Sequence, residues 1–78
     1  MTKTDNIQIQ ISITENRILN EQRGIDNMRD NLSRIVTGGS DYDLATHGAS
    51  YIRHIEEGLR KISEAKEQIK LLRWALEA

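Results

Sequence analysis

The chain has 78 residues, no cysteine and no proline, and a formal net charge of −1 from 11 basic and 12 acidic side chains. That length allows one small domain, and the lack of cysteine excludes disulfides and thiolate metal sites. The balanced charge favours neither a nucleic-acid nor an anionic-lipid surface, so we expect neither partner. No apolar run is long enough for a transmembrane helix or a signal peptide, and we expect a cytoplasmic protein.

Apolar residues recur at helical spacing in two stretches, separated by a turn that contains Gly38 and Gly39. This pattern predicts an all-α fold: a coiled-coil-like, antiparallel two-helix hairpin that forms one domain over residues 1–78. We expect the first arm over about 5–37, the turn at 38–40 and the second arm over about 41–77. Folding at the glycines predicts contacts between residues whose numbers add to about 78. The predicted core seam comprises Ile18, Ile25, Leu32, Ile55, Leu59, Ile62 and Ile69.

Residues 6–14 leave an alternative open, because isoleucine and polar residues alternate strictly there. Such alternation is the period of a half-buried strand, and isoleucine favours strands. No second segment of the chain alternates, and a lone strand would leave its backbone groups unpaired. We favour a helix, with a strand that pairs across a homodimer or with another protein as the alternative.

Both helix ends at the turn carry local signals. Gly38 is suited to a left-handed cap at the end of the first arm. Ser40, followed three residues later by Asp43, predicts a capping box at the start of the second arm.

Small or polar residues interrupt the apolar spacing of both arms. Thr14 and Glu21 break the first seam, and Gly24 lies beside it, as a tolerated defect or a close helix approach rather than a kink. Gly48 and Gly58 lie near the second seam, where a small residue lets a neighbouring helix approach.

Apolar residues beyond the needs of a two-helix contact gather near the two chain ends. Because the hairpin brings these ends together, we expect the extra residues to meet in one patch at its open end. A wide apolar patch on a small protein usually marks an interface, and Trp and Leu suit a buried contact. Alternatively, this face closes a homodimeric four-helix bundle, and a homodimer is our first expectation for the oligomeric state. The predicted partner-binding residues are Ile9, Ile13, Leu71, Trp74 and Ala75.

No catalytic constellation, cofactor motif or complete metal site is found in the sequence, so we expect a protein that is not an enzyme. Asp43, His47, Tyr51 and His54 would share one face of a helix. That face could hold zinc or copper with a symmetry mate, or form a pH-sensitive seam. Ordinary packing of polar residues is the favoured interpretation, because the two histidines are two turns apart, roughly 10 Å along the axis.

The composition and pattern predict a protein-binding module that occludes or chaperones a partner. Two helices around Gly38-Gly39 resemble the small hairpin co-chaperones of type III secretion needle subunits, and a phage-type inhibitor would have the same size. The resemblance implies a hairpin that masks a partner; it carries over no residue-level motif, and residues 6–14 lie outside it. The alternative is an oligomeric helical protein that binds a small ligand or RNA.

Overall fold

The computed structural model describes residues 2–78 and is an antiparallel helical hairpin. The first arm is helix α1, Lys3–Gly38. The second arm consists of one short helix, α2 (Asp41–Asp43), a π-helical turn, η1 (Leu44–Gly48), and the long helix α3 (Ala49–Glu77). The predicted all-α hairpin is confirmed. The alternative of a strand at residues 6–14 is wrong, because these residues lie within α1.

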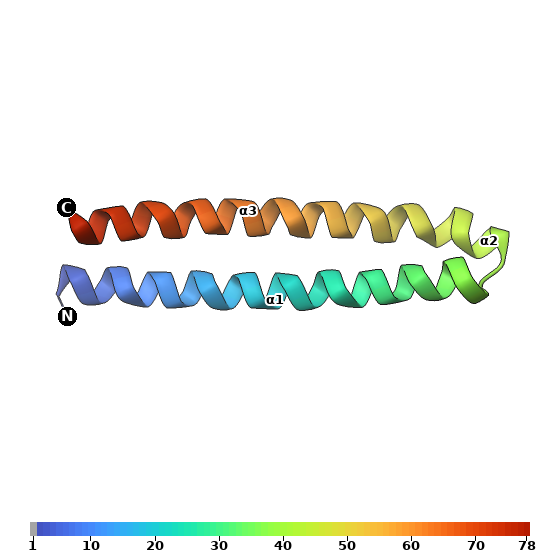
Figure 1. The fold of residues 1–78 in the computed structure, drawn as a ribbon, viewed down its shortest axis with the longest axis horizontal. Helices are drawn as coiled ribbons and strands as arrows, with labels where there is room; N and C mark the ends of the chain where they lie inside the picture. The colour runs from blue at the N-terminus through green and yellow to red at the C-terminus, as the bar shows by residue number, and fades with distance from the viewer. Residues whose placement is uncertain (1) are drawn as a thin grey trace.

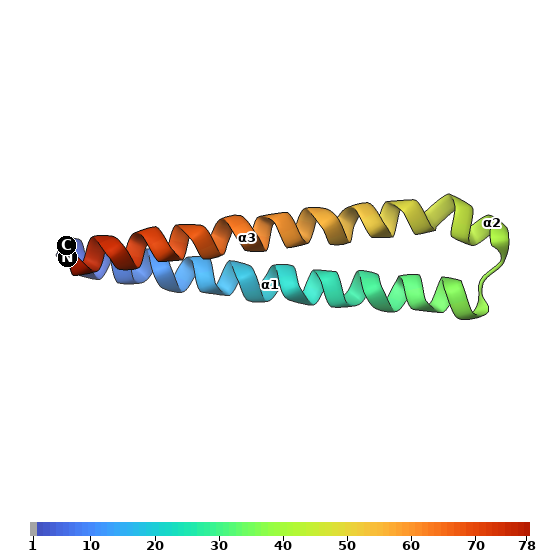
Figure 2. The ribbon, with the colours of Figure 1, turned by 45° about the horizontal axis from the view of Figure 1, so that its top comes forward.

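The two arms run side by side along their whole length, with both termini at one end and the loop at the other (Figure 1). Figure 2 shows them overlapping at the terminal end and separating towards the loop, so the pair twists along its axis. The hairpin measures 56 × 15 × 14 Å. A body this thin has room for one layer of side chains between the helices and for no wider core.

Each arm starts with a capping box. The Thr2 hydroxyl accepts a hydrogen bond from the Asp5 amide at 3.1 Å, and the Ser40 hydroxyl accepts one from the Asp43 amide at 3.1 Å. Each cap satisfies an amide that the first turn of a helix leaves without a backbone partner. The predicted cap at Ser40 is therefore confirmed.

The prediction of a left-handed cap at Gly38 is wrong. No glycine among residues 2–78 has a positive φ, and Gly39 ends α1 in an extended conformation with φ −89° and ψ 166°. A glycine is needed for a different reason. The Gly39 amide donates to the Ile35 carbonyl at 3.0 Å, and a Cβ on Gly39 would lie 2.8 Å from the same oxygen.

The seam between the arms follows one heptad pattern in each arm, and each of its residues is buried or half-buried. Elsewhere in residues 2–78, only Asn31, Asp43 and Ala75 are not exposed. The first arm contributes Ile7, Ile11, Thr14, Ile18, Glu21, Ile25, Met28, Leu32 and Ile35. The second arm contributes Gly48, Tyr51, Ile55, Gly58, Ile62, Ala65, Ile69, Leu72 and Leu76.

Most of the predicted seam residues lie in this seam. Ile25, Ile62 and Ile69 are buried, and Ile18, Leu32 and Ile55 are half-buried. Leu59 differs from the prediction: its neighbour Gly58 occupies the seam position, and Leu59 is 48% exposed beside it.

Thr14 and Glu21 occupy seam positions rather than interrupting the seam. Thr14 is the most buried side chain at 2% exposure, and its hydroxyl donates to the Gln10 carbonyl at 2.8 Å. The hydroxyl is thus satisfied within its own helix, which removes the usual penalty for burying a polar group.

Small residues on the second arm let large residues of α1 approach closely. A Cβ on Gly58 would lie 2.8 Å from Cγ1 of Ile25, and one on Gly48 would lie 3.9 Å from Cδ1 of Leu32. The predicted close approach is confirmed at Gly58, whereas at Gly48 the contact with α1 is an ordinary van der Waals contact. Gly24 has nothing within 4 Å of its Cβ position, so it is a tolerated exposed glycine and not a contact point.

The helices pair in a different register from the predicted one. Leu32 lies near Gly48, Ile25 lies against Gly58, Glu21 lies 4.0 Å from Lys61 and Glu15 lies 3.8 Å from Arg73. The paired numbers therefore add to between 80, near the loop, and 88, near the open end, instead of 78. The second arm begins with α2, at the loop end of the hairpin (Figure 1), and continues through the wide turn η1, which already packs beside α1. Extended along the seam, the Ile25–Gly58 pairing places Ile7 level with Leu76.

Candidate interaction surface

The hairpin has two flanks, defined by position next to the seam. Residues directly before a seam residue form the preceding flank, and residues directly after one form the following flank. Lys61, before Ile62, pairs with Glu21 across the preceding flank. Arg73 and Glu15, which follow Leu72 and Thr14, pair across the following flank. Each flank therefore contains residues of both arms on one side of the molecule.

Four of the five predicted partner-binding residues are exposed apolar side chains at the open end. Ile9 and Ile13 are 40% and 46% exposed, and Leu71 and Trp74 are 60% and 68% exposed. Ala75 is half-buried. These five residues are called the open-end patch below. Their exposure is much greater than a folded chain needs for its own core, which is the property expected of a docking surface.

The open-end patch extends over more than one side of the hairpin. Ile13, Leu71 and Ala75 lie on the preceding flank. Ile9 lies midway between the seam residues before and after it, and so does Trp74. Both therefore face outward, on opposite sides of the hairpin. The patch wraps around the open end from the outside of α1 to the outside of α3.

Each half of the open-end patch lines its own shallow groove. On α1, Ile9 and Ile13 line a groove of about 440 Å³ together with Asp5, Gln8, Ser12 and Asn16. On α3, Leu71 and Trp74 line a groove of about 330 Å³ together with Glu67 and Lys70. Both grooves follow a helix surface, which suits an extended or helical segment of a partner better than a small molecule.

Sequence reasoning missed a second group of exposed apolar residues. Leu19, Val36, Ile52 and Leu59 are between 47% and 62% exposed, and each directly follows a seam residue. We call these four residues the following-flank stripe. The sequence contains the pattern, because each of these four apolar residues directly follows a seam residue. Leu59 can be assigned to the flank only when Gly58 is recognised as the seam residue.

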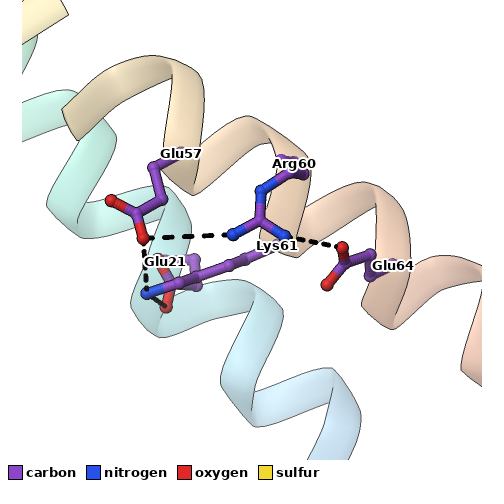
Figure 3. A network of polar contacts seen from close by, with 5 residues as sticks. All are labelled: Glu21, Glu57, Arg60, Lys61 and Glu64. Atoms are coloured by element: carbon purple, nitrogen blue, oxygen red, sulfur yellow. Dashed lines mark hydrogen bonds and ion pairs between the residues drawn. The ribbon is translucent and has the colours of Figure 1, made fainter. Parts of the chain in front are cut away.

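Charged side chains near the middle of the hairpin form an exposed network. Arg60 pairs with Glu64 at 2.8 Å and with Glu57 at 3.9 Å, and Lys61 bridges Glu57 and Glu21, each at 4.0 Å (Figure 3). Surface pairs of this kind contribute little to stability individually. One of them, Lys61 with Glu21, joins the two arms and so favours the observed register.

The histidine face is broken up by the turn η1 and by the seam. Tyr51 is a seam residue, whereas His47 and His54 lie on the preceding flank. The rings of His47 and Tyr51 are tilted by 36°, with centroids 6.4 Å apart. Within residues 2–78, no three His, Asp or Glu side chains come close enough together to hold a metal ion.

Comparison with protein-family models, with curated proteins and with solved structures finds no match for this chain. Over the part of the chain that the structure describes, neither long helix has an apolar stretch sufficient to cross a bilayer.

Proposed function

We propose that this chain is a non-enzymatic protein-binding module that self-associates and that occludes or chaperones a segment of a partner protein at its open end. The observation that carries the proposal is the exposure of Leu71 and Trp74, at 60% and 68%, in a groove on the outside of α3. Trp is the residue type most enriched among interface anchors, and Leu71 supplies apolar area beside it.

The ends of the two arms supply a docking surface of two parts. A partner helix on α3 would cover Leu71 and Trp74, and a segment on α1 would cover Ile9 and Ile13. One partner that wraps the open end could use both, with Ala75 beneath it. Occlusion follows because the apolar face of the partner would be hidden while it is bound.

Site-specific photo-cross-linking tests this proposal. A photoreactive residue at position 71 should form one dominant adduct with a partner in extracts of the native host. The matched control places the same residue at Arg60, which is exposed on α3 but surrounded by charge. Adducts of equal yield at both positions, or none at position 71, would contradict the proposal.

A second candidate function is favoured by one further feature of α3. Lys66, Lys70, Arg73 and Trp74 line a groove of about 560 Å³, together with Ile69 and Glu77. Cations beside an aromatic ring suit single-stranded RNA, because phosphates meet the cations and a base stacks on the ring. RNA binding that falls with salt, and that Lys70→Glu abolishes while Leu71→Glu does not, would favour this candidate over a protein partner.

A further inference from the structure

The hairpin exposes more surface than a compact protein of its mass. Its accessible surface is 6004 Å² at 9.0 kDa. A compact monomer of that mass exposes about 4,900 Å², so the excess is about 1,100 Å². A standard protein interface buries about 800 Å² on each partner. The excess is therefore sufficient for a full interface on this chain.

The core inside one hairpin is correspondingly small. Ile25, Ile62, Ala65 and Ile69 are its buried apolar residues, and the seam residues towards the loop are mostly half-buried. Domains of this size rarely gain more than about 3–5 kcal/mol from a single core, so they usually require a staple or a partner.

The following-flank stripe lies where a second layer would complete this core. Val36, Ile52 and Leu59 extend the apolar seam by one position on the same flank. Leu19 adds a fourth apolar side chain towards the open end, separated from Val36 on α1 by Gln22, Asp26, Arg29 and Ser33. An apolar seam widened by the next position is the pattern of helices that pack in a four-helix bundle, whereas a two-stranded pair needs the seam alone. Along the helix axis, the stripe from Leu19 to Val36 is roughly 25 Å long.

We propose that a second copy of this chain covers the following-flank stripe and forms a four-helix bundle, which leaves the open-end patch of each copy free. This inference rests on the self-association included in the proposed function, and it assigns that self-association to a surface. The opposite flank of the same half is lined by polar and charged residues and by Gly24, so it offers no comparable apolar area.

Charged residues on the following flank can pair with those of a second copy. Arg29 lies on the following flank near the middle of the stripe, with Asp26 and Glu56 on the same flank. Within residues 2–78, Arg29 has no carboxylate within 4.0 Å. A two-fold axis in the interface, through the middle of the stripe, brings Arg29 of each copy opposite Asp26 or Glu56 of the other, depending on the direction of the axis. The net charge of −1 adds almost no repulsion between copies.

Sedimentation equilibrium of three proteins tests the assignment. Wild type and Leu71→Glu should be dimers at micromolar concentration, and Leu59→Glu should dimerise at least roughly tenfold more weakly. Leu59 and Leu71 are exposed leucines of one helix, so the two variants are matched. A monomeric wild type would overturn self-association itself. A dimer that Leu71→Glu disrupts and Leu59→Glu does not would overturn only the assigned surface.

Thiol labelling provides a second measurement for the case in which Leu59→Glu unfolds. The chain has no cysteine, so Leu59→Cys and Leu71→Cys each carry a single thiol. Labelling of Leu59→Cys should slow as protein concentration rises, while labelling of Leu71→Cys stays constant. The emission of Trp74, the one tryptophan, should also stay constant with concentration. Protection at position 71, or a concentration-dependent blue shift of Trp74, would overturn the proposal.

Discussion

Gly58 lies so close to Ile25 that a Cβ on the glycine would meet Cγ1 of the isoleucine at 2.8 Å. Ile25 is itself 4% exposed and has little freedom to move aside. This contact favours the observed register, because Ile25 packs where α3 has no side chain. It also explains why Leu59, one residue further on, is directed to the flank.

Two glycine-to-alanine variants should therefore have opposite effects. Gly24→Ala adds a methyl group into open space and should stabilise the protein by about 0.5–1 kcal/mol through helix propensity. Gly58→Ala gains the same propensity, but overpacking against Ile25 costs about 1–3 kcal/mol and should make the variant less stable than Gly24→Ala. Urea titration followed by circular dichroism measures both. Equal stabilisation by the two variants would show that the Ile25–Gly58 contact is absent.

The loop glycines form a second matched pair. Gly39→Ala places a Cβ against the Ile35 carbonyl and should destabilise the hairpin by about 1 kcal/mol, whereas Gly38→Ala has nothing within 4 Å to meet. The melting temperatures of the two variants compare the positions. A lower melting temperature for Gly38→Ala than for Gly39→Ala would contradict a steric requirement for glycine at position 39.

A charge in the seam should be far more damaging than the loss of one at the surface. Ile62 is 8% exposed, and Ile62→Asp buries a carboxylate without a partner, which costs several kcal/mol and approaches the whole stability of a domain this small. Glu57→Ala removes exposed ion pairs to Arg60 and Lys61 and should cost a few tenths of a kcal/mol. If both variants melt alike, the seam has been assigned to the wrong face.

The buried hydroxyl of Thr14 is expected to be dispensable. It donates to the Gln10 carbonyl, which belongs to the same helix, so its removal leaves no buried donor without a partner. Thr14→Val should leave the free energy of unfolding within about 1 kcal/mol of wild type, with a gain favoured because a methyl group replaces the hydroxyl in an apolar layer. A loss of 2 kcal/mol or more in chemical denaturation would show that the hydroxyl has a further partner.

The fold could be predicted from the sequence because large apolar residues recur at helical spacing in both arms. Ile18, Ile25 and Leu32 on one arm, with Ile62 and Ile69 on the other, are sufficient to define two helices. The register could not be predicted, because two seam positions are not occupied by large apolar residues. An apolar pattern selects Leu59 instead of its neighbour Gly58, and it treats Thr14 as a gap in the seam. The length that α2 and η1 add at the loop is also invisible in such a pattern.

The exposed patch was predictable in its residues but not in its shape. Ile9, Ile13, Leu71 and Trp74 exceed what two helices need, and that excess is visible in the sequence. Whether the two halves meet depends on the direction in which each residue leaves its helix. That direction follows from the seam, which places Ile13, Leu71 and Ala75 on one flank and Ile9 and Trp74 on opposite outer faces.

The measurement that tests the account most directly is the affinity of the cross-linked partner for Trp74→Ala, with Tyr42→Ala as control. Tyr42 is an aromatic residue 75% exposed at the loop end, far from the open-end patch. If the open end is the docking surface, Trp74→Ala should weaken binding by about 2 kcal/mol or more, with helicity retained because Trp74 lies outside the seam. Tyr42→Ala should bind as wild type does. Unchanged affinity for Trp74→Ala, or an equal loss for Tyr42→Ala, would contradict the account.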